Sequence, residues 1–280
     1  MKLTIIGANS MKFFKQIIIL ITACLVLGAC QQDKTSNKQI IVGTSPGPYS
    51  QLFLDAVKPI LEKQGYQIKQ VDFSDLMQAD IALQQGSIDV NVDQHTAYMD
   101  AFNQNKKANL VALTHIPTVP TAIYSKRHTN LQAIKKGSAI AVPNDPANAA
   151  RAYRLLAKAG WITLKPSTNP GMISKNDIKS NPYELNITEL DPGNIPRTLS
   201  DFDYSVIPGS RAYAAKINPD LALLQEDIIP SFELVVAVRA DNAPKEWAQA
   251  VKSAYSSAEF KQYMHTHNTK NYWYVPKENN

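Results

Sequence analysis

The sequence predicts an α/β protein of two lobes, each built on a mixed, mostly parallel sheet flanked by helices, with a ligand cleft between the lobes. Two observations predict this fold. From residue 38 onward, short β-branched runs alternate with helical patterns, which is typical of sheets covered by helices on both faces. In addition, two similar apolar strands end in a basic residue, at 119–127 ("VPTAIYSKR") and 231–240 ("SFELVVAVRA"). Two such strands would carry the chain into a second lobe and back, and clefts between lobes commonly bind small molecules.

The first 29 residues are typical of an export signal. Lys12 and Lys15 precede the apolar run 17–29, which is too short for a comfortable membrane span. The run ends in "LGAC", which resembles a bacterial lipobox, so we expect Cys30 to be lipidated and residues 1–29 to be removed. An uncleaved signal anchor and an ordinary cleaved signal are the alternatives. Met11 is the expected start of translation, which makes residues 1–10 an upstream extension.

The expected mature chain is close to neutral. Its first residues, 30–38, are the lipidated cysteine and a polar tether. The signal segment contains three of the 29 basic residues and no acidic ones, which leaves 26 basic against 24 acidic residues. The pI near 9.0 is therefore no argument for a nucleic-acid partner. Both cysteines, Cys24 and Cys30, precede the folded part, so a core without disulfides must stabilise it.

The elements of the folded part are predicted in chain order. The first lobe is expected at 39–120 and 236–280, and the second at 121–235. The helical stretch 49–66 places Leu52, Ala56 and Ile60 on one face. A further helix is expected at 74–86, and another begins after residue 144. Strands are expected at 39–44, 67–73, 87–92, 121–127, 138–143, 183–190, 203–208 and 234–240.

The segment 140–151 ("IAVPNDPANAAR") contains a candidate anion site. Asp145 is a good N-cap and Pro146 a good first helical residue. Arg151 lies about one turn into this helix, where the helix dipole disfavours a cation. A ligand carboxylate at the helix start, bound also by the arginine, would compensate for this repulsion. Pairing of Arg151 with a surface acid is the alternative.

Several phrases of the sequence resemble those of the NlpA lipoprotein family. They are "PNDPxNxxRAxxLLxKAG" at 143–160, "QHxxYxxxFN" at 94–103, and similar stretches at 42–66 and 196–207. The resemblance covers essentially the whole mature chain. It implies a two-lobed periplasmic-binding-protein fold of type II-like architecture. It also implies a lipid-anchored receptor in the cell envelope that passes an amino acid, methionine in typical members, to the permease and ATPase of an ABC importer.

The resemblance also implies the residues that bind the ligand. Arg151 matches the arginine that binds the ligand carboxylate, and Asn148 matches a neighbouring pocket residue. His95 and Tyr98 match positions that line the pocket, although a histidine at a strand end is more often simply packed or exposed. No cofactor and no nucleic-acid partner are implied.

The chain departs from the family pattern at several of these positions. Asp93 replaces a phenylalanine, and Asp80 replaces an asparagine. The family asparagine that holds the amino-acid group falls in Pro208-Gly209-Ser210, where Ser210 is a shorter substitute. A buried, unpaired carboxylate is costly. We therefore hypothesise that Asp80 and Asp93 face a ligand with an extra cationic or donor group, such as a basic amino acid or a short peptide. The alternative is that both face solvent.

Two other classes of function are considered. The chain has no nucleophile-elbow, metalloprotease or phosphate-loop motif, so we do not expect an enzyme. The five histidines show no spacing typical of a metal site; they are His95, His115, His128, His265 and His267. A surface lipoprotein with a structural or adhesive role is the remaining alternative, and it would not need Arg151 beside a helix start.

Overall fold

The structure is a computed structural model that describes residues 38–167, 169–268 and 272–279. The signal segment expected at 1–29, the lipidation site expected at Cys30 and most of the expected tether lie outside the described residues. The described residues from Gln39 onward form one compact unit.

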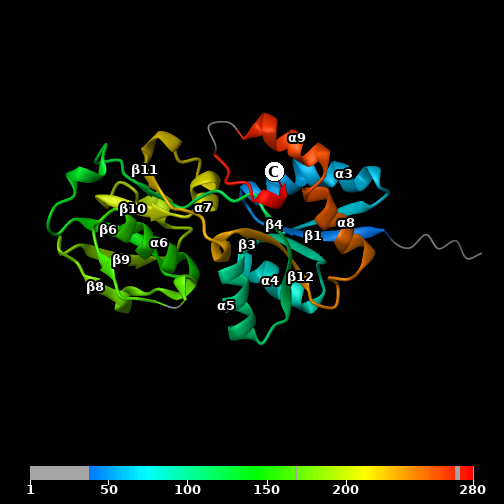
Figure 1. Cartoon of the computed structure of the whole chain (residues 1–280), viewed down its shortest axis with the longest axis horizontal. Helices are drawn as coiled ribbons and strands as arrows, with labels where there is room; N and C mark the ends of the chain where they lie inside the picture. The colour runs from blue at the N-terminus through cyan, green and yellow to red at the C-terminus, as the bar shows by residue number, and fades with distance from the viewer. Residues whose placement is uncertain (1–37, 168, 269–271, 280) are drawn as a thin grey trace, which may run out of the picture. The chain divides into compact units, whose positions relative to one another are not determined.

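The first lobe is built on a five-stranded sheet of order β2-β1-β3-β12-β4 (Figure 1). Its strands are β1 (Gln39–Thr44), β2 (Gln67–Asp72), β3 (Val90–His95), β4 (Leu110–Ile116) and β12 (Leu234–Arg239). Its helices are α2 (Pro48–Leu52), α3 (Lys58–Lys63), α4 (Leu76–Gln85), α5 (Thr96–Lys106), α8 (Glu246–Tyr255) and α9 (Ala258–His267), with a π-helical segment η1 (Phe53–Val57) and a short 3-10 segment η9 (Lys277–Asn279).

The second lobe is built on a five-stranded sheet of order β11-β5-β10-β6-β9. Its strands are β5 (Ala122–Tyr124), β6 (Ala139–Pro143), β9 (Asn186–Leu190), β10 (Tyr204–Ile207) and β11 (Ala222–Gln225), and a small hairpin pairs β7 (Thr163–Leu164) with β8 (Ile178–Ser180). Its helices are α6 (Pro146–Lys158) and α7 (Gly209–Ala214). The 3-10 segments are η2 (Leu131–Ala133), η3 (Pro170–Met172), η4 (Lys175–Asp177), η5 (Ile195–Thr198), η6 (Pro219–Leu221) and η7 (Pro230–Phe232).

Both sheets are mixed, and the antiparallel pairings share a pattern. In the first sheet, β1 pairs in parallel with β2 and β3, while β12 is antiparallel to both its neighbours. In the second sheet, β6 pairs in parallel with β9 and β10, while β5 is antiparallel to both its neighbours. β5 and β12 lie in the two similar sequence stretches that bracket the middle of the chain. The expectation of two mixed sheets with helices around them is confirmed, whereas the lobe boundaries at 120/121 and 235/236 stay predictions.

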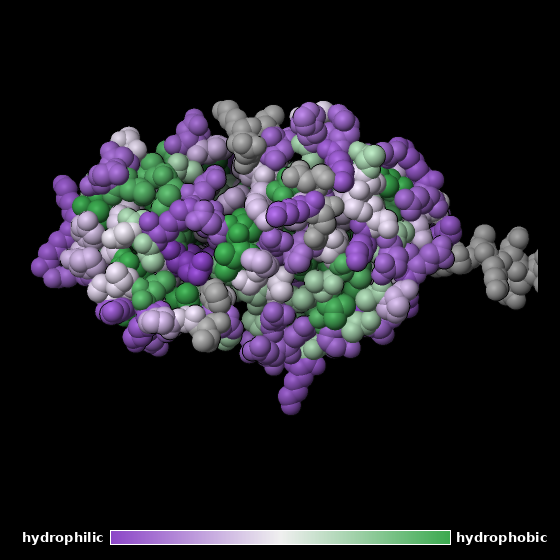
Figure 2. Space-filling view, viewed as in Figure 1, coloured by the Kyte–Doolittle hydropathy of each residue, from purple (hydrophilic) through white to green (hydrophobic). Residues whose placement is uncertain are grey.

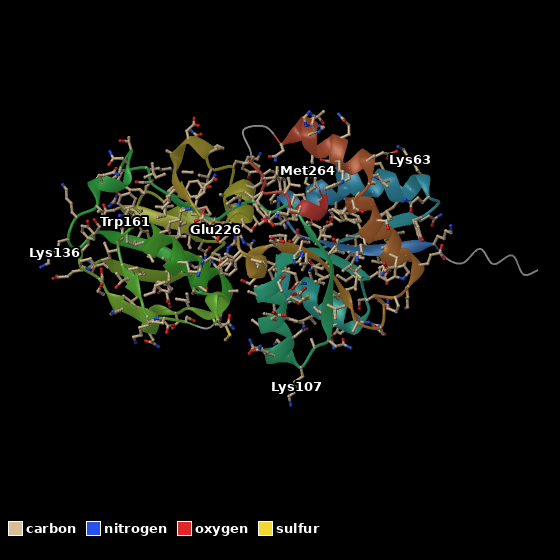
Figure 3. The ribbon with its side chains drawn as sticks, viewed as in Figure 1. Lys63, Lys107, Lys136, Trp161, Glu226 and Met264 are labelled. Carbon is tan, nitrogen blue, oxygen red and sulfur yellow. The ribbon has the colours of Figure 1, made fainter. Side chains whose placement is uncertain are left out.

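Each lobe has its own hydrophobic core. Residues of β1, β3 and β12 pack with α2, η1, α3, α8 and α9 in the first lobe, where Met264 is buried. A second cluster joins β6, β10 and α6 in the second lobe, where Trp161, labelled in Figure 3, is buried and its ring contacts that of Tyr204. Because each sheet buries its own apolar side chains, the space between the lobes does not have to be filled by core residues.

The helix expected over 49–66 is interrupted. The chain is helical from Pro48 to Lys63, but a π-helical segment, η1, separates α2 from α3. Pro59 explains the interruption, because it has no N–H to donate to the carbonyl of Asp55 one turn earlier. A wider turn ahead of the proline accommodates the missing bond.

The third strand differs from its expected position. It was expected at 87–92 but runs from Val90 to His95, and β4 and β11 were not expected at all. Pairing with β12 extends β3 as far as His95, because Leu234 lies opposite His95 and Val235 lies opposite Gln94. This long-range pairing is not visible in the local apolar pattern, because Asp93, Gln94 and His95 are polar.

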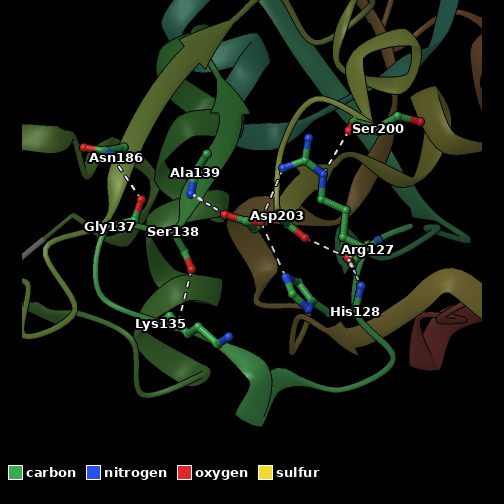
Figure 4. Close-up of polar contacts among 10 residues, drawn as sticks. Arg127, His128, Lys135, Gly137, Ser138, Ala139, Asn186, Ser200 and Asp203 are labelled. Carbon is green, nitrogen blue, oxygen red and sulfur yellow. Dashed lines mark hydrogen bonds and ion pairs between the residues drawn. The ribbon is translucent and has the colours of Figure 1, made fainter.

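A polar cluster around Asp203 links the amino ends of β6 and β10 in the second sheet (Figure 4). The carboxylate of Asp203 accepts hydrogen bonds from the Ala139 N–H at 2.8 Å and from Arg127 Nη1 at 3.4 Å. His128 Nε2 lies 3.5 Å from the same carboxylate. Burial tends to raise the pKa of Asp203, but these donors outweigh it and lower the pKa. The cluster is structural and lies on lobe 2, outside the cavity described below.

Hydrophobic residues on the face seen in Figure 2 form small areas among hydrophilic ones. Exposed large hydrophobic side chains include Met77, Met172 and Tyr213. Within the described ranges, no helix combines the length and the apolar character needed to cross a bilayer.

Candidate ligand-binding site

A cavity of about 350 Å³ is lined by both lobes. Its volume is at the lower end of the range for small-molecule sites. From the first lobe it is lined by Ser45, Pro46, Gly47, Tyr49, Asp75, Leu76, Met77, Asp93, Gln94, His95, Tyr98 and Leu234. From the second lobe it is lined by Asn144, Asp145, Asn148, Arg151, Asp191, Pro192, Pro208, Ser210 and Arg211. Six of the seven predicted binding residues therefore share one cavity, and Asp80 is the exception.

Arg151 is buried in the wall of this cavity, with 3% of its surface exposed. Its Nε and Nη2 donate to the carboxylate of Glu226, whose side chain is also buried. Its Nη1 donates to Asn148 Oδ1 at 3.2 Å, and its guanidinium lies 5.5 Å from the centre of the Phe232 ring. The counterion is thus a buried glutamate 75 residues away, not the surface acid considered from the sequence.

The start of α6 has the predicted caps. The Asp145 side chain accepts from the Asn148 N–H at 3.0 Å, and Pro146 is the first helical residue. Asn148 Nδ2 also donates to the Asp145 carboxylate, at 3.1 and 3.2 Å. Asn148 therefore links the N-cap to Arg151, which fixes both at the cavity wall. Glu226 accounts for an arginine near the positive end of a helix, because its charge balances the guanidinium.

His95 is a neutral histidine at the junction of β3 and α5. Its Nδ1 accepts from the Tyr98 N–H at 3.2 Å and so caps α5, which places the ring proton on Nε2. Burial and the nearby charge of Arg151 lower its pKa to about 3, against the opposing effect of the neighbouring Asn148 side chain. Its Nε2 has no hydrogen-bond partner among the residues that the structure describes. His95 therefore offers a buried N–H donor beside Arg151.

We expect His95 to make the stability of the protein pH-dependent. The unfolded histidine takes up a proton near pH 6.5, whereas the folded one resists protonation until about pH 3, so folding is penalised as the pH falls between these values. When the pH is lowered from 7 to 5, the free energy of unfolding of the wild type should fall by about 1–2 kcal/mol more than that of His95→Asn, which keeps a capping side chain. Urea denaturation at the two pH values measures this difference. Equal losses in the two proteins would contradict a neutral, buried His95.

Asp93 is already satisfied by its own lobe. Its carboxylate accepts from the N–H and Oγ of Ser45, at 3.0 and 2.8 Å, and from the N–H and Oγ of Ser50, at 3.1 and 2.7 Å. Burial raises its pKa, and the serine hydrogen bonds oppose that rise. Ser45 and Ser50 thus supply donors that the hypothesis assigned to a ligand cation, and because Asp93 lines the cavity, its contact with a ligand stays a prediction.

Asp80 does not line the cavity. It is fully buried on α4, behind β3, where its Oδ1 accepts from Gln94 Nε2 at 2.6 Å and from Asn91 Nδ2 at 3.2 Å. Burial raises its pKa well above the ordinary range. The sequence-based assignment of Asp80 as a ligand contact is thus corrected, and so is the alternative that it faces solvent. Its contact with Gln94 is its connection to the site.

Tyr98 and Ser210 lie at the cavity as predicted, on α5 and α7. Burial raises the pKa of Tyr98, so its hydroxyl stays protonated. Ser210 faces Gly47 across the lobes, with its Cβ 3.9 Å from the position of an added Gly47 side chain. The neighbouring Gly209 has no room for a side chain, because the backbone at Val119 and Pro120 passes beside it.

Several residues that line the cavity or contact its lining were missed from the sequence. Glu226, which holds Arg151, comes from the segment after β11, and Tyr49 comes from α2. The Tyr49 hydroxyl accepts from the Val119 N–H at 3.2 Å. Gln94 precedes the predicted residue His95, and Arg211 follows the predicted residue Ser210. These adjacent positions were the signal in the sequence that could have indicated them. Glu226 had no such signal, because only the fold brings it to α6.

Among the described residues, no group of three or more histidine, cysteine, aspartate and glutamate side chains is placed to hold a metal ion. The cavity lining is mixed: polar and charged side chains make up most of it, and a few apolar ones, among them Leu76, Met77 and Leu234, lie between them. Such a lining suits reversible binding of a small polar molecule.

Relatives with established names resemble the chain over most of its length. A probable D-methionine-binding lipoprotein MetQ of Haemophilus influenzae is 33% identical over 257 residues, which cover 89% of this chain and 94% of that protein. The D-methionine-binding lipoprotein MetQ of Escherichia coli K12 is 33% identical, over 84% of this chain and 88% of that protein. The model of the NlpA lipoprotein family matches residues 40–276.

Solved structures show the same architecture. A nutrient binding protein from Burkholderia cenocepacia bound to methionine is 34% identical, with a TM-score of 0.78, and the match covers 84% of this chain and 99% of that one. A crystal structure of the methionine binding protein MetQ is 30% identical, also with a TM-score of 0.78, over 86% of this chain and 98% of that one. The family model, the named relatives and the shared architecture agree: this chain belongs to the NlpA lipoprotein family.

Proposed function

We propose that this protein is a lipid-anchored receptor that captures an amino acid between its lobes and delivers it to the permease of an ABC importer. The observation that carries the proposal is Arg151, a buried arginine in the wall of a cavity that both lobes line. The relatives support it, because two are named as D-methionine-binding lipoproteins and one structure contains methionine.

Arg151 retains hydrogen-bonding capacity for a ligand carboxylate. A guanidinium has five N–H groups. Glu226 takes those of Nε and one on Nη2, and Asn148 takes one on Nη1. One N–H therefore remains on each of the two Nη atoms. Together with His95 Nε2, they would bind a carboxylate with charge-assisted hydrogen bonds.

Charge balance favours a zwitterion over a simple anion. Glu226 already neutralises Arg151 inside the protein, so a ligand carboxylate adds an uncompensated negative charge to a buried site. An α-amino acid carries its own ammonium and avoids this cost. Apolar side chains on the lining, among them Leu76, Met77 and Leu234, would surround a thioether side chain. Methionine is therefore the ligand that we propose.

A second ligand class is favoured by two acidic residues of the lining. Asp75 and Asp191 both line the cavity, and each uses a carboxylate oxygen to bind a backbone N–H of its own segment, that of Gln78 and that of Gly193. Their charges would attract a second cationic group on the ligand. A basic amino acid or a short peptide is accordingly the alternative ligand.

A thermal-shift panel tests the proposed function. We expect L- or D-methionine to stabilise the protein, by about 2.7 kcal/mol at a concentration 100 times the Kd. Lysine, arginine and short dipeptides in the same panel test the alternative ligand class. Mass spectrometry of the recovered ligand should show it chemically unaltered, since a receptor releases what it binds. If no amino acid or dipeptide stabilises the protein, the proposed function is wrong.

A further inference from the structure

A β-bulge in β3 sets which side chains of this strand face α4. Opposite β12, Val235 pairs with Gln94 and Ala237 pairs with Asn91, so three steps along β3 match two steps along β12. The extra residue lies between Asn91 and Gln94, and the Asp93 N–H bonds to the Asn91 side-chain oxygen at 2.7 Å. In a regular strand, residues 91 and 94 would face opposite sides. The bulge brings both to the same side, which is a common use of bulges near functional sites.

Asp80 holds the amide of Gln94 in one orientation. Its Oδ1 accepts the Nε2–H of Gln94 at 2.6 Å, and the amide of Asn91 donates to the same oxygen. Turning the Gln94 amide over would place its oxygen against Asp80 Oδ1, the oxygen that acts as an acceptor toward the Asn91 amide. The amide nitrogen of Gln94 therefore donates to Asp80, and the amide oxygen Oε1 points away from the Asp80 carboxyl.

The Oε1 atom of Gln94 is a buried acceptor on a residue of the cavity lining. Gln94 is 1% exposed and belongs to the cavity lining. Within the described ranges, its Oε1 has no hydrogen-bond partner. A buried acceptor without a donor costs free energy, which a ligand donor would recover. Gln94 thus adds an acceptor to a site where the adjacent His95 and the facing Arg151 present donors.

Two acidic groups near this point, Asp93 and Glu226, already have hydrogen-bond donors. The Asp93 carboxylate accepts four hydrogen bonds from Ser45 and Ser50, and the Glu226 carboxylate is bound by Arg151 and by the Thr121 N–H. An incoming ammonium would have to displace these donors to reach either carboxylate. Gln94 Oε1 requires no such displacement.

We propose that Gln94 Oε1 accepts a hydrogen bond from the α-ammonium of the bound amino acid, and that Asp80 is a positioning residue that fixes the Gln94 amide for this contact. This inference rests on the proposed function and deepens it, because it explains how the site distinguishes an amino acid from the corresponding carboxylic acid. The ligand carboxylate would lie at Arg151 and His95, and the ammonium at Gln94.

The test compares two ligands that differ in the amino group alone. L-methionine and 4-(methylthio)butanoate, which is methionine without its amine, are titrated calorimetrically into the wild type and into Gln94→Met. We expect the wild type to prefer methionine, and the variant to lose about 10- to 100-fold of that preference, because a hydrogen bond to a charged group is lost. The affinity for the acid should change little.

Three results have distinct meanings. If the wild type binds neither compound and no other amino acid, the proposed function fails. If it binds both compounds equally well, or if Gln94→Met weakens both to the same degree, the ammonium contact is overturned. Should Gln94→Met not fold, Gln94→Asn serves instead, since it keeps the amide but withdraws it by one methylene. Circular dichroism, which does not depend on ligand binding, reports folding in every variant.

Asp80 variants separate positioning from packing. Asp80→Asn keeps an oxygen that can accept from Gln94 Nε2, so the preference for methionine should stay within about threefold of the wild type. Asp80→Leu removes the acceptor and should lower the preference while the acid still binds. A preference unchanged by Asp80→Leu would overturn the positioning role.

Discussion

Replacing Arg151 by methionine is expected to weaken amino-acid binding at least 100-fold, because a buried, charge-assisted contact to the ligand carboxylate is lost. The same change leaves the carboxylate of Glu226 buried without its partner. Breaking a buried ion pair in this way typically costs about 3–5 kcal/mol of stability. Calorimetric titration with L-methionine and urea denaturation measure the two effects separately.

A double variant separates lost binding from lost stability. In Arg151→Met/Glu226→Gln no charge is left unpaired, so most of the stability should return while binding stays lost. Arg154→Met is the matched control, because Arg154 lies on the same helix, is half-buried and does not line the cavity. If the double variant binds methionine as the wild type does, Arg151 does not bind the carboxylate, and the proposed site is wrong.

Gly209→Ala is expected to destabilise the protein by about 2–3 kcal/mol, which is a typical cost of overpacking. An added Cβ would lie 2.5 Å from both Cγ1 and O of Val119 and 2.8 Å from the Pro120 oxygen. Two of these atoms belong to the backbone of the segment that leads into the second lobe, so they cannot rotate away. Ligand affinity should fall as well, because Pro208 and Ser210 on either side line the cavity.

Gly47→Ala is the matched control for this substitution. Gly47 is also at the cavity, but its backbone is extended and the nearest atom to an added Cβ lies 3.9 Å away. We expect it to change the free energy of unfolding by less than about 0.5 kcal/mol, as at sites without a special constraint. Similar losses in the two variants, measured by urea denaturation, would show that the close approach at Gly209 is not the cause.

The local pattern predicted the helix that carries Arg151. Asp145 and Pro146 are a cap and a first helical residue in the sequence, and they are so in the structure. Local rules succeed here because capping depends on residues within one turn of each other. The same rules placed the third strand too early and missed β4, because those elements depend on pairing with β12, more than 100 residues away.

Six of the seven predicted site residues line one cavity, Asp80 does not, and their contacts with a ligand stay predictions. Family phrases in the sequence indicated His95, Tyr98, Asn148 and Arg151, and the structure brings these residues to one cavity. Asp80 and Asp93 are both acidic and both depart from the family pattern, yet they have different surroundings. Serines at the start of α2 satisfy Asp93, whereas Asp80 lies behind β3 against Gln94. Residue type alone could not separate them.

By itself, the sequence determined that this chain is an α/β protein of two lobes and where the capped helix that carries Arg151 begins, since alternation and capping are local properties. Only the tertiary structure decided which charge balances Arg151 and which way Gln94 faces. Glu226 reaches Arg151 because the chain returns along the sheet of the second lobe, and Gln94 reaches Asp80 because a bulge against β12 changes the alternation of β3. Both depend on contacts between distant segments, and such contacts leave no local pattern in the sequence.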